Sequence, residues 1–295
     1  MNLPLPGTLV DSDWLHTHLG HPALIVLDAS VDLPSPGFDG DYRVASGHDG
    51  WLRAHIPGSR HADLLTALAD TRASFSFALP APAVLIQALA DLGVGVGRSV
   101  VIYDRSDGFW AARLWWMLRG LGIDAAVLDG GFNAWRQAGL PQHAGPGAMV
   151  GAAVPWPLAP RPGLWIDRAG VEAIVAGQAP GLLVCALGAA LFEGSATTRY
   201  ARRGHIPGSH NLPARGLFDA QGRYLSKDAL ALAIGPTLLH GDVPLILYCG
   251  GGICAAANAL ALTLLGRQNI AIYDGSLQEW AADPRLPMTT GAAPA

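Results

Sequence analysis

The sequence has little charge, almost no lysine and no long uninterrupted apolar segment. Charged residues make up 14% of the 295 residues, and the formal net charge is −4. Because Lys227 is the only lysine, the chain has no basic stripe that could follow a phosphate backbone, and we expect no nucleic-acid partner. No apolar run approaches the roughly 20 residues that cross a bilayer, and residues 1–7 lack both segments of a secretory leader. We therefore expect a soluble, cytoplasmic protein without a membrane partner.

Cysteine is scarce as well. The three cysteines, Cys185, Cys249 and Cys254, all lie in the second half of the chain and are too few to form a disulfide scaffold. Their odd number raises the question of a reactive thiol. A dinucleotide cofactor is not expected, because no Gly-x-Gly-x-x-Gly motif opens a helix after a first strand with an acidic residue further on.

The chain carries one pattern twice. The motif His-Ile-Pro-Gly-Ser occurs at residues 55–59 and again at residues 205–209. Four further pairs keep the same order, namely residues 10–11 with 166–167, 27–29 with 184–186, 103–104 with 248–249, and 129–135 with 274–280. At 51% apolar residues, the chain can form two cores in domains of about 150 residues each. We interpret it as a tandem duplication rather than a solenoid.

A segment rich in Pro, Gly and Ala at residues 139–163 separates the two copies, and this composition favours an extended linker. We predict a first domain at residues 1–145, a linker at residues 146–162 and a second domain at residues 163–295. The histidines of the two repeated motifs are expected to serve the fold, because both copies have them.

Short apolar segments alternate with helix-forming segments in each copy. In the second copy we expect strands at residues 182–185, 245–248 and 270–273, and a helix at residues 254–265 that ends before Gly266. Strand, helix and strand in alternation predict an α/β fold in which each domain has a parallel sheet with helices on both faces.

Cys249 follows the predicted strand at residues 245–248 and precedes three glycines and a helix. Glycines allow successive backbone N–H groups to turn toward one point, and a helix N-terminus adds about half a positive charge there. Such surroundings lower a thiol pKa from about 8.5 into the range of roughly 3.5 to 7.5, which makes Cys249 a candidate nucleophile. The alternative is an inert apolar cysteine at the end of a strand. The first copy has Asp104 at the equivalent position, so the fold itself does not require cysteine there.

Several motifs resemble those of tandem-domain sulfurtransferases of the rhodanese superfamily, over nearly the whole chain. They are residues 100–104 followed by residues 113–118, residues 128–135, both His-Ile-Pro-Gly motifs, and a cysteine loop in the second copy alone. The resemblance implies two rhodanese-like domains, of which the first is inactive with Asp104 at the nucleophile position. It implies that Cys249 of the second domain takes a sulfane sulfur from 3-mercaptopyruvate or thiosulfate as a persulfide. Thioredoxin, glutathione or cyanide would be the acceptor, and neither a cofactor nor a metal ion is required.

By the same resemblance, the N–H groups of the loop would stabilise the thiolate and the persulfide; they belong to Gly250, Gly251, Gly252, Ile253 and Cys254. The loop lacks a cation and is more similar to the mercaptopyruvate type than to the thiosulfate type. It departs from that type at Gly251, where a serine is usual, and at Cys254, where a threonine is usual.

Outside the loop, the resemblance points to two further candidate site residues. Arg199 matches a substrate-binding arginine and could hold a carboxylate in a bidentate fork, although it could also be an ordinary surface arginine. Asp63 aligns with an aspartate near the site, but Phe77 stands where a histidine usually follows. Leu187 replaces a second arginine that would bind the substrate carboxylate.

The role of Cys254 has two interpretations. It could attack a Cys249 persulfide as a resolving thiol, or it could simply replace threonine in the packing of the helix. Cys185 is expected to be an inert core residue. A second function for the same fold is a sulfur-relay or redox-sensing module without small-molecule turnover. A cysteine phosphatase is not expected, because Ala255 stands where its phosphate-binding arginine would be.

Overall fold

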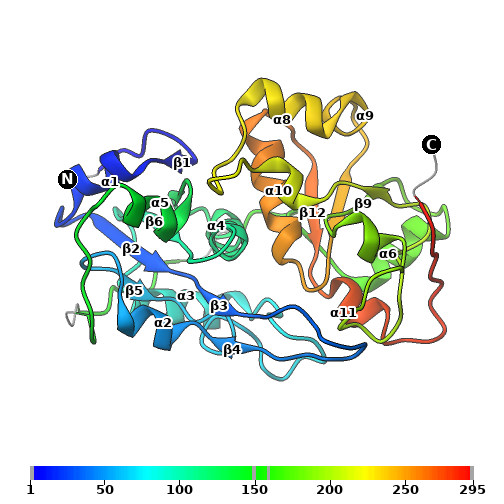
Figure 1. The fold of residues 1–295 in the computed structure, drawn as a ribbon, viewed down its shortest axis with the longest axis horizontal. Helices are drawn as coiled ribbons and strands as arrows, with labels where there is room; N and C mark the ends of the chain where they lie inside the picture. The colour runs from blue at the N-terminus through cyan, green and yellow to red at the C-terminus, as the bar shows by residue number, and fades with distance from the viewer. Residues whose placement is uncertain (1–2, 148–150, 158–159, 293–295) are drawn as a thin grey trace.

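The computed structural model describes residues 3–147, 151–157 and 160–292. The two halves of the chain form two lobes side by side, each around its own sheet (Figure 1). Among the described residues, no helix combines the length and apolar character needed to cross a bilayer.

The first sheet has five parallel strands in the order β1-β7-β6-β2-β5. They are β1 (Leu9–Val10), β2 (Leu24–Asp28), β5 (Arg60–His61), β6 (Ser99–Tyr103) and β7 (Ala125–Leu128). The central strand β6 is buried along its whole length, as an apolar strand covered on both faces should be.

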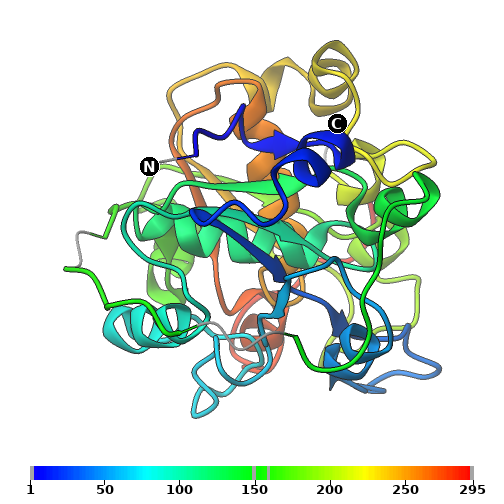
Figure 2. The ribbon, with the colours of Figure 1, turned by 90° about the vertical axis from the view of Figure 1, so that its left-hand side faces the viewer.

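Helices cover both faces of this sheet (Figure 2). The helices of the first half are α1 (Ser12–His18), α2 (His48–Arg53), α3 (Pro82–Asp91), α4 (Phe109–Gly120) and α5 (Gly131–Gln137). Along β6, Val101 and Tyr103 pack with α1 and α5, whereas Val100 and Ile102 belong to the core that contains α3 and α4. The two cores follow from the period-2 alternation of side chains along a strand.

The second sheet repeats this topology in the order β10-β9-β11-β12-β8, and each strand holds the place of its counterpart in the first sheet. Its strands are β8 (Trp165–Ile166), β9 (Leu182–Cys185), β10 (His210–Asn211), β11 (Leu245–Tyr248) and β12 (Ile270–Tyr273). The helical segments are α6 (Arg168–Val175), α7 (Ala189–Phe192), η1 (Ala214–Leu217), α8 (Lys227–Ile234), α9 (Pro236–Leu239), α10 (Ile253–Leu264) and α11 (Ser276–Trp280). The predicted α/β fold with two parallel sheets is confirmed. The predicted helix at residues 254–265 begins one residue earlier, at Ile253, and ends at Leu264 ahead of the left-handed Gly266.

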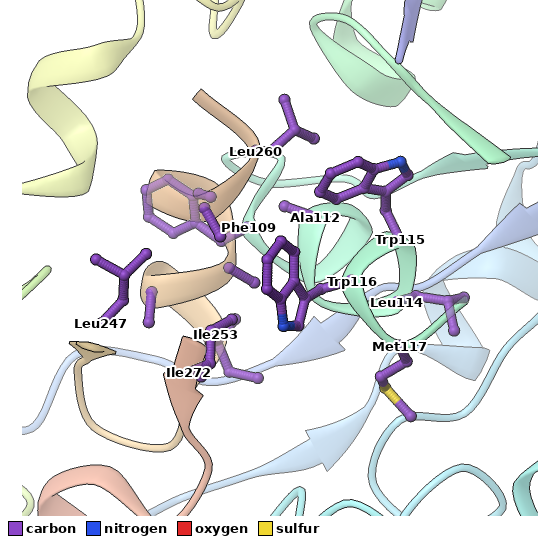
Figure 3. Packing of buried hydrophobic residues seen from close by; sticks show 14 of the residues in the cluster. Phe109, Ala112, Leu114, Trp115, Trp116, Met117, Leu247, Ile253, Leu260 and Ile272 are labelled. Atoms are coloured by element: carbon purple, nitrogen blue, oxygen red, sulfur yellow. The ribbon is translucent and has the colours of Figure 1, made fainter. Parts of the chain in front are cut away.

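Helices α4 and α10 join the two lobes by packing against each other. Figure 3 shows Phe109 and Trp116 of α4 facing Ile253 and Leu260 of α10. The Trp116 Nε1–H also donates to the Leu164 carbonyl, at 3.1 Å. The core is therefore continuous between the copies, which fixes the start of α10 relative to the first domain.

An arm of the first domain adds to this contact. It carries the antiparallel pair β3 (Val31–Asp32) and β4 (Ala45–Ser46), and it extends beneath the second lobe (Figure 1). There, Asp39 accepts a hydrogen bond from the Thr198 N–H and pairs with Arg203 at 2.8 Å. The arm thus brings residues of the first copy to the edge of the second.

The predicted linker at residues 146–162 lies between α5 and β8, and part of it falls outside the described residues. Of the rest, Trp156 is buried, and the N–H of Ala153 donates to the Ala90 carbonyl of α3. This part of the linker therefore packs on the first domain. The domain boundaries themselves stay a prediction.

Candidate active site

The loop at residues 249–252 connects β11 to α10. At the end of β11, the Tyr248 hydroxyl donates to Ser209 Oγ at 2.8 Å and accepts from the Ile206 N–H, so the strand is anchored to the second His-Ile-Pro-Gly-Ser motif. The loop begins at Cys249 and ends at Gly252, which adopts φ +77° as the N-cap of α10. A left-handed residue at this position turns the chain into the helix, and glycine does so without steric cost.

The start of α11 holds the loop backbone in place. The Cys249 N–H donates to Ser276 Oγ at 3.1 Å, and the Cys249 carbonyl accepts from the Leu277 N–H at 3.1 Å. The Gly250 carbonyl accepts from the Gln278 N–H at 2.9 Å. Because both carbonyls are bound behind the loop, its N–H groups are free to face the other way.

Side chains from distant segments leave no room for a side chain on the loop glycines. The Tyr200 hydroxyl lies against Gly250, on the position that a Cβ atom would occupy. A Cβ on Gly251 would lie 2.6 Å from Gln278 Nε2. A Cβ on Gly252 would lie 2.7 Å from Nη1 of the fully buried Arg113, which reaches the loop from α4.

The Cys249 thiol is 2% exposed, and its pKa reflects two opposing effects. Burial alone would raise the pKa, but hydrogen bonds from the Cys254 side chain and from the N–H groups of Ala255, Gly251 and Cys254 lower it to about 6. The thiolate form is therefore dominant at neutral pH. Two of the five N–H groups expected from the sequence, those of Gly251 and Cys254, are among these donors, and Ala255 is an addition.

Asp104 occupies the equivalent point of the first domain, after β6 and before α4, and is 1% exposed. Its Oδ1 accepts from the N–H groups of Ser106 at 2.9 Å and Gly108 at 3.0 Å, and its Oδ2 from that of Ala111 at 3.0 Å. Gly108 is the left-handed N-cap of α4, as Gly252 is of α10. A similar loop, one residue longer before its N-cap in the first copy, therefore holds a carboxylate in one copy and a thiol in the other.

A cleft of about 800 Å³ opens between the lobes beside the Cys249 loop. Its walls are mostly apolar, and the side chains from the second domain include Leu187, Leu191, Tyr200, Ile253 and Cys254. Phe109 and Trp110 face them from α4.

Two arginines also line the cleft. Arg215 forms a bidentate ion pair with Asp107 of the first domain, at 2.6 and 2.7 Å, and so bridges the two lobes. Arg199 donates through Nη2 to the Pro34 carbonyl of the arm, at 3.0 Å. The predicted anion-binding residue Arg199 and the apolar Leu187 thus share one cavity with Cys254 at the start of α10.

Asp63 is not brought to this cleft. Its carboxylate accepts from the Leu65 N–H and the Thr66 hydroxyl, both at 2.8 Å, and so caps its own turn. Asp63 is not among the described residues that line the cleft. Phe77, at φ +66°, packs on Trp110 and faces Gly251. An aromatic ring therefore occupies the position at which the family resemblance predicts a histidine.

The two other thiols differ in environment. Cys254 is partly exposed and lines the cleft, and its hydrogen bond to Cys249 raises the pKa of the Cys254 thiol well above its usual value. Cys185 is fully buried at the end of β9, and burial raises its pKa to about 12. Within the described residues, no cluster of three or more His, Cys, Asp or Glu side chains could hold a metal ion.

The sequence did not reveal four residues that contact the loop. Ser276 and Gln278 hold its backbone, and Tyr200 and Arg113 pack on its glycines. Only Arg113 lies within one of the motifs that carry the resemblance. The absence of side chains at residues 250–252 is the one signal that bulky neighbours lie close to this loop.

Comparisons with known proteins agree with this architecture. The Rhodanese-like domain family matches residues 11–138 and 186–283. The 3-mercaptopyruvate sulfurtransferase of Escherichia coli K12 is 32% identical over 95% of this chain and 96% of its own length. A thiosulfate/3-mercaptopyruvate sulfurtransferase of Arabidopsis thaliana is also 32% identical, over 95% of this chain and 86% of its own. The crystal structure of SseA, a 3-mercaptopyruvate sulfurtransferase from Escherichia coli, superimposes with a TM-score of 0.77 at 29% identity and covers 91% of this chain and 98% of that one.

Proposed function

The chain belongs to the rhodanese family as a tandem-domain sulfurtransferase, and from this premise we propose that Cys249 is its catalytic nucleophile. The enzyme moves sulfur from a small donor to a thiol acceptor. The observation that carries the proposal is the thiol with a pKa of about 6 beside the cleft between the lobes. A thiolate is both the attacking group in the first step and the leaving group in the second, and a lowered pKa favours the latter.

The proposed donor is 3-mercaptopyruvate. The Cys249 thiolate attacks the donor sulfur and forms an S–S bond, while the C–S bond breaks and its electron pair passes to the carbon skeleton, which takes up a proton as pyruvate. An acceptor thiolate then attacks the outer sulfur of the persulfide and releases Cys249 as thiolate. The amides of Gly251, Cys254 and Ala255 lie where this negative charge resides, which supports the assignment.

The cleft supports a donor with a single carboxylate. Arg199 lines it and can hold a carboxylate, whereas Leu187 provides an apolar wall where relatives of the mercaptopyruvate type have a second arginine. The loop itself has no cationic side chain, which disfavours the thiosulfate dianion as the better donor. Among acceptors, we include thioredoxin, glutathione and cyanide in the proposal. Three free cysteines support a reducing compartment, such as the cytoplasm, as the place of action.

The test loads the protein with each donor in turn and locates the added sulfur. Trypsin cleaves after Lys227 and Arg267 and so releases Cys249 and Cys254 in one peptide, with Cys185 in another. We expect residues 228–267 to gain one sulfur atom with 3-mercaptopyruvate, faster than with thiosulfate, and the Cys249→Ser variant to gain none. The measurement is best made in the Cys254→Ser background, in which the second thiol of the peptide is absent. If neither donor adds sulfur, the relay module that receives sulfur from a partner protein replaces this proposal.

A further inference from the structure

Cys249 and Cys254 form a pair of thiols around the start of α10. Their side chains are joined by a hydrogen bond, in which the Cys254 thiol donates to the Cys249 thiolate. Cys254 is the second residue of α10, and the residues between the two cysteines are three glycines and Ile253. The pair therefore spans a single short loop.

The two sulfurs differ in their access to solvent. Cys249 is 2% exposed, whereas Cys254 is partly exposed and lines the cleft. A molecule that enters the cleft therefore meets Cys254 at the wall, while Cys249 lies behind it. The third thiol, Cys185, is fully buried and binds Tyr248, so it does not compete for this position.

We propose that Cys254 resolves the Cys249 persulfide, so that the enzyme releases sulfide and closes a Cys249–Cys254 disulfide. This inference rests on the proposed function, because it starts from the persulfide. It adds a second outcome to sulfur transfer: the sulfur leaves as free sulfide instead of on an acceptor.

The step balances without an external oxidant. The Cys254 sulfur attacks Sγ of Cys249, a bond forms between the two, and the bond from Sγ to the outer sulfur breaks. The outer sulfur leaves with that electron pair and takes the Cys254 proton, so the product is HS⁻. The sulfane sulfur is reduced to sulfide, while the two cysteine sulfurs are oxidised to a disulfide.

Loop geometry suits the reaction. A disulfide needs Cα atoms about 4.4 to 6.8 Å apart. Gly250, Gly251 and Gly252 have the backbone freedom to bring Cys254 to this spacing, while hydrogen bonds to α11 hold Cys249 in place. The hydrogen bond between the thiols already brings the reacting sulfurs together before the donor arrives.

Reopening the disulfide requires two electrons from a dithiol. The dithiol reaches Cys254 first, from the cleft, and attack there expels Cys249, whose low pKa makes it the better leaving group. The second thiol of the reductant then releases Cys254. The inferred partner is thus a dithiol, either a small one or a protein with a Cys-x-x-Cys site, rather than a monothiol.

The experiment follows one turnover without an acceptor. Wild type, Cys254→Ser and Cys185→Ala are each mixed with 3-mercaptopyruvate, and inorganic polysulfide serves as a second probe that loads the thiol directly. Samples are quenched with an alkylating agent at intervals, digested with trypsin and weighed. Cys254→Ser keeps a hydrogen-bond donor but lacks the thiol, and Cys254→Thr repeats the test with a second hydroxyl.

For wild type and Cys185→Ala, we expect the peptide of residues 228–267 to gain sulfur briefly and then to become lighter by two hydrogens than the reduced peptide. With 3-mercaptopyruvate, one sulfide should be released per chain. For both Cys254 variants, the persulfide should last at least about ten times longer, with no sulfide above background. Addition of dithiothreitol should return the wild-type peptide to its reduced mass.

Two results would overturn the inference while leaving the proposed function intact. One is a persulfide that decays equally fast in wild type and Cys254→Ser. The other is an extra sulfur found on Cys254, which would make this residue a carrier instead of a resolving thiol. A Cys254→Ser protein that takes up no sulfur from either probe would instead refute the Cys249 persulfide itself, and the inference with it.

Discussion

The two copies of the fold hold different chemical groups at the same place. After β6, three backbone N–H groups bind the Asp104 carboxylate, and after β11, three N–H groups bind the Cys249 thiolate. In both copies a left-handed glycine caps the helix that follows. The duplicated backbone thus supplies an anion site twice, and one residue decides whether that site can accept sulfur.

The residues next to Asp104 and next to Cys249 differ at corresponding positions. In the first copy, Arg105 follows Asp104 and pairs with the buried Asp28 at 3.1 Å. In the second copy, Gly250 follows Cys249, and Cys185 occupies the strand position that corresponds to Asp28. The second copy therefore lacks both members of this ion pair. The Tyr200 hydroxyl lies where a side chain on Gly250 would begin. The first loop is closed by an ion pair, whereas the second has three glycines after the thiol and is packed by Tyr200.

The largest effect is expected from Cys249→Asp, which gives the second loop the anion of the first. The N–H groups should bind the carboxylate as they do at Asp104, so the midpoint of thermal unfolding should change little. Sulfur transfer should fall to background, because a carboxylate cannot form a persulfide. Steady-state assays with calorimetry on the same samples check both points. Turnover above background would mean that another residue carries the sulfur.

Loss of the ion pair that joins the two copies should lower the stability strongly. Arg113 belongs to the first copy, is fully buried, and pairs with Asp274 of the second at 2.6 Å while it lies against Gly252. Arg113→Leu leaves that carboxylate without its cation, and we expect a loss of about 3 kcal/mol in the free energy of unfolding. Urea unfolding measures it. Asp274→Asn is the matched control, because its amide can still accept a hydrogen bond, and an equal or larger loss there would contradict this account.

A smaller effect is expected when a single methyl group is added to the second loop. The Cβ atom of Gly250→Ala would run into the Tyr200 hydroxyl, and such overpacking costs about 1 to 3 kcal/mol. We expect kcat/KM to fall roughly tenfold or more as the loop shifts. Tyr200→Phe removes the clashing oxygen, so the double variant should recover part of the loss. If the single variant behaves as wild type, the loop is not held as tightly as described.

The sequence predicts much of this comparison and misses a definable part. The repeated motifs and the Asp104 and Cys249 alignment indicate the duplication, because each motif is local and occurs twice. The set of expected N–H groups ended at Cys254 and so missed one donor, Ala255. Since α10 begins at Ile253, the N–H of Ala255 is still in the first turn, where helix N–H groups have no partner within the helix.

The remaining misses come from contacts between segments that are far apart in the chain. Tyr200, Gln278 and Arg113 meet the loop only after three separate segments have packed around it, and no local pattern encodes such a meeting. Asp63 shows the converse. The resemblance suggests a place near the site, yet its carboxylate is satisfied by its own turn, where nearby donors are available at little entropic cost.

The central claim is that Cys249 is held as a thiolate by inward-facing N–H groups, and its alkylation rate as a function of pH tests this most directly. A thiol with a lowered pKa is protonated below that value and ionised above it. In the wild-type protein, with the modified cysteine located by fragmentation of the peptide of residues 228–267, the rate for Cys249 should rise through about pH 6 and level off near neutrality. A rate that instead climbs through about pH 8.5, as for an ordinary thiol, would contradict the account.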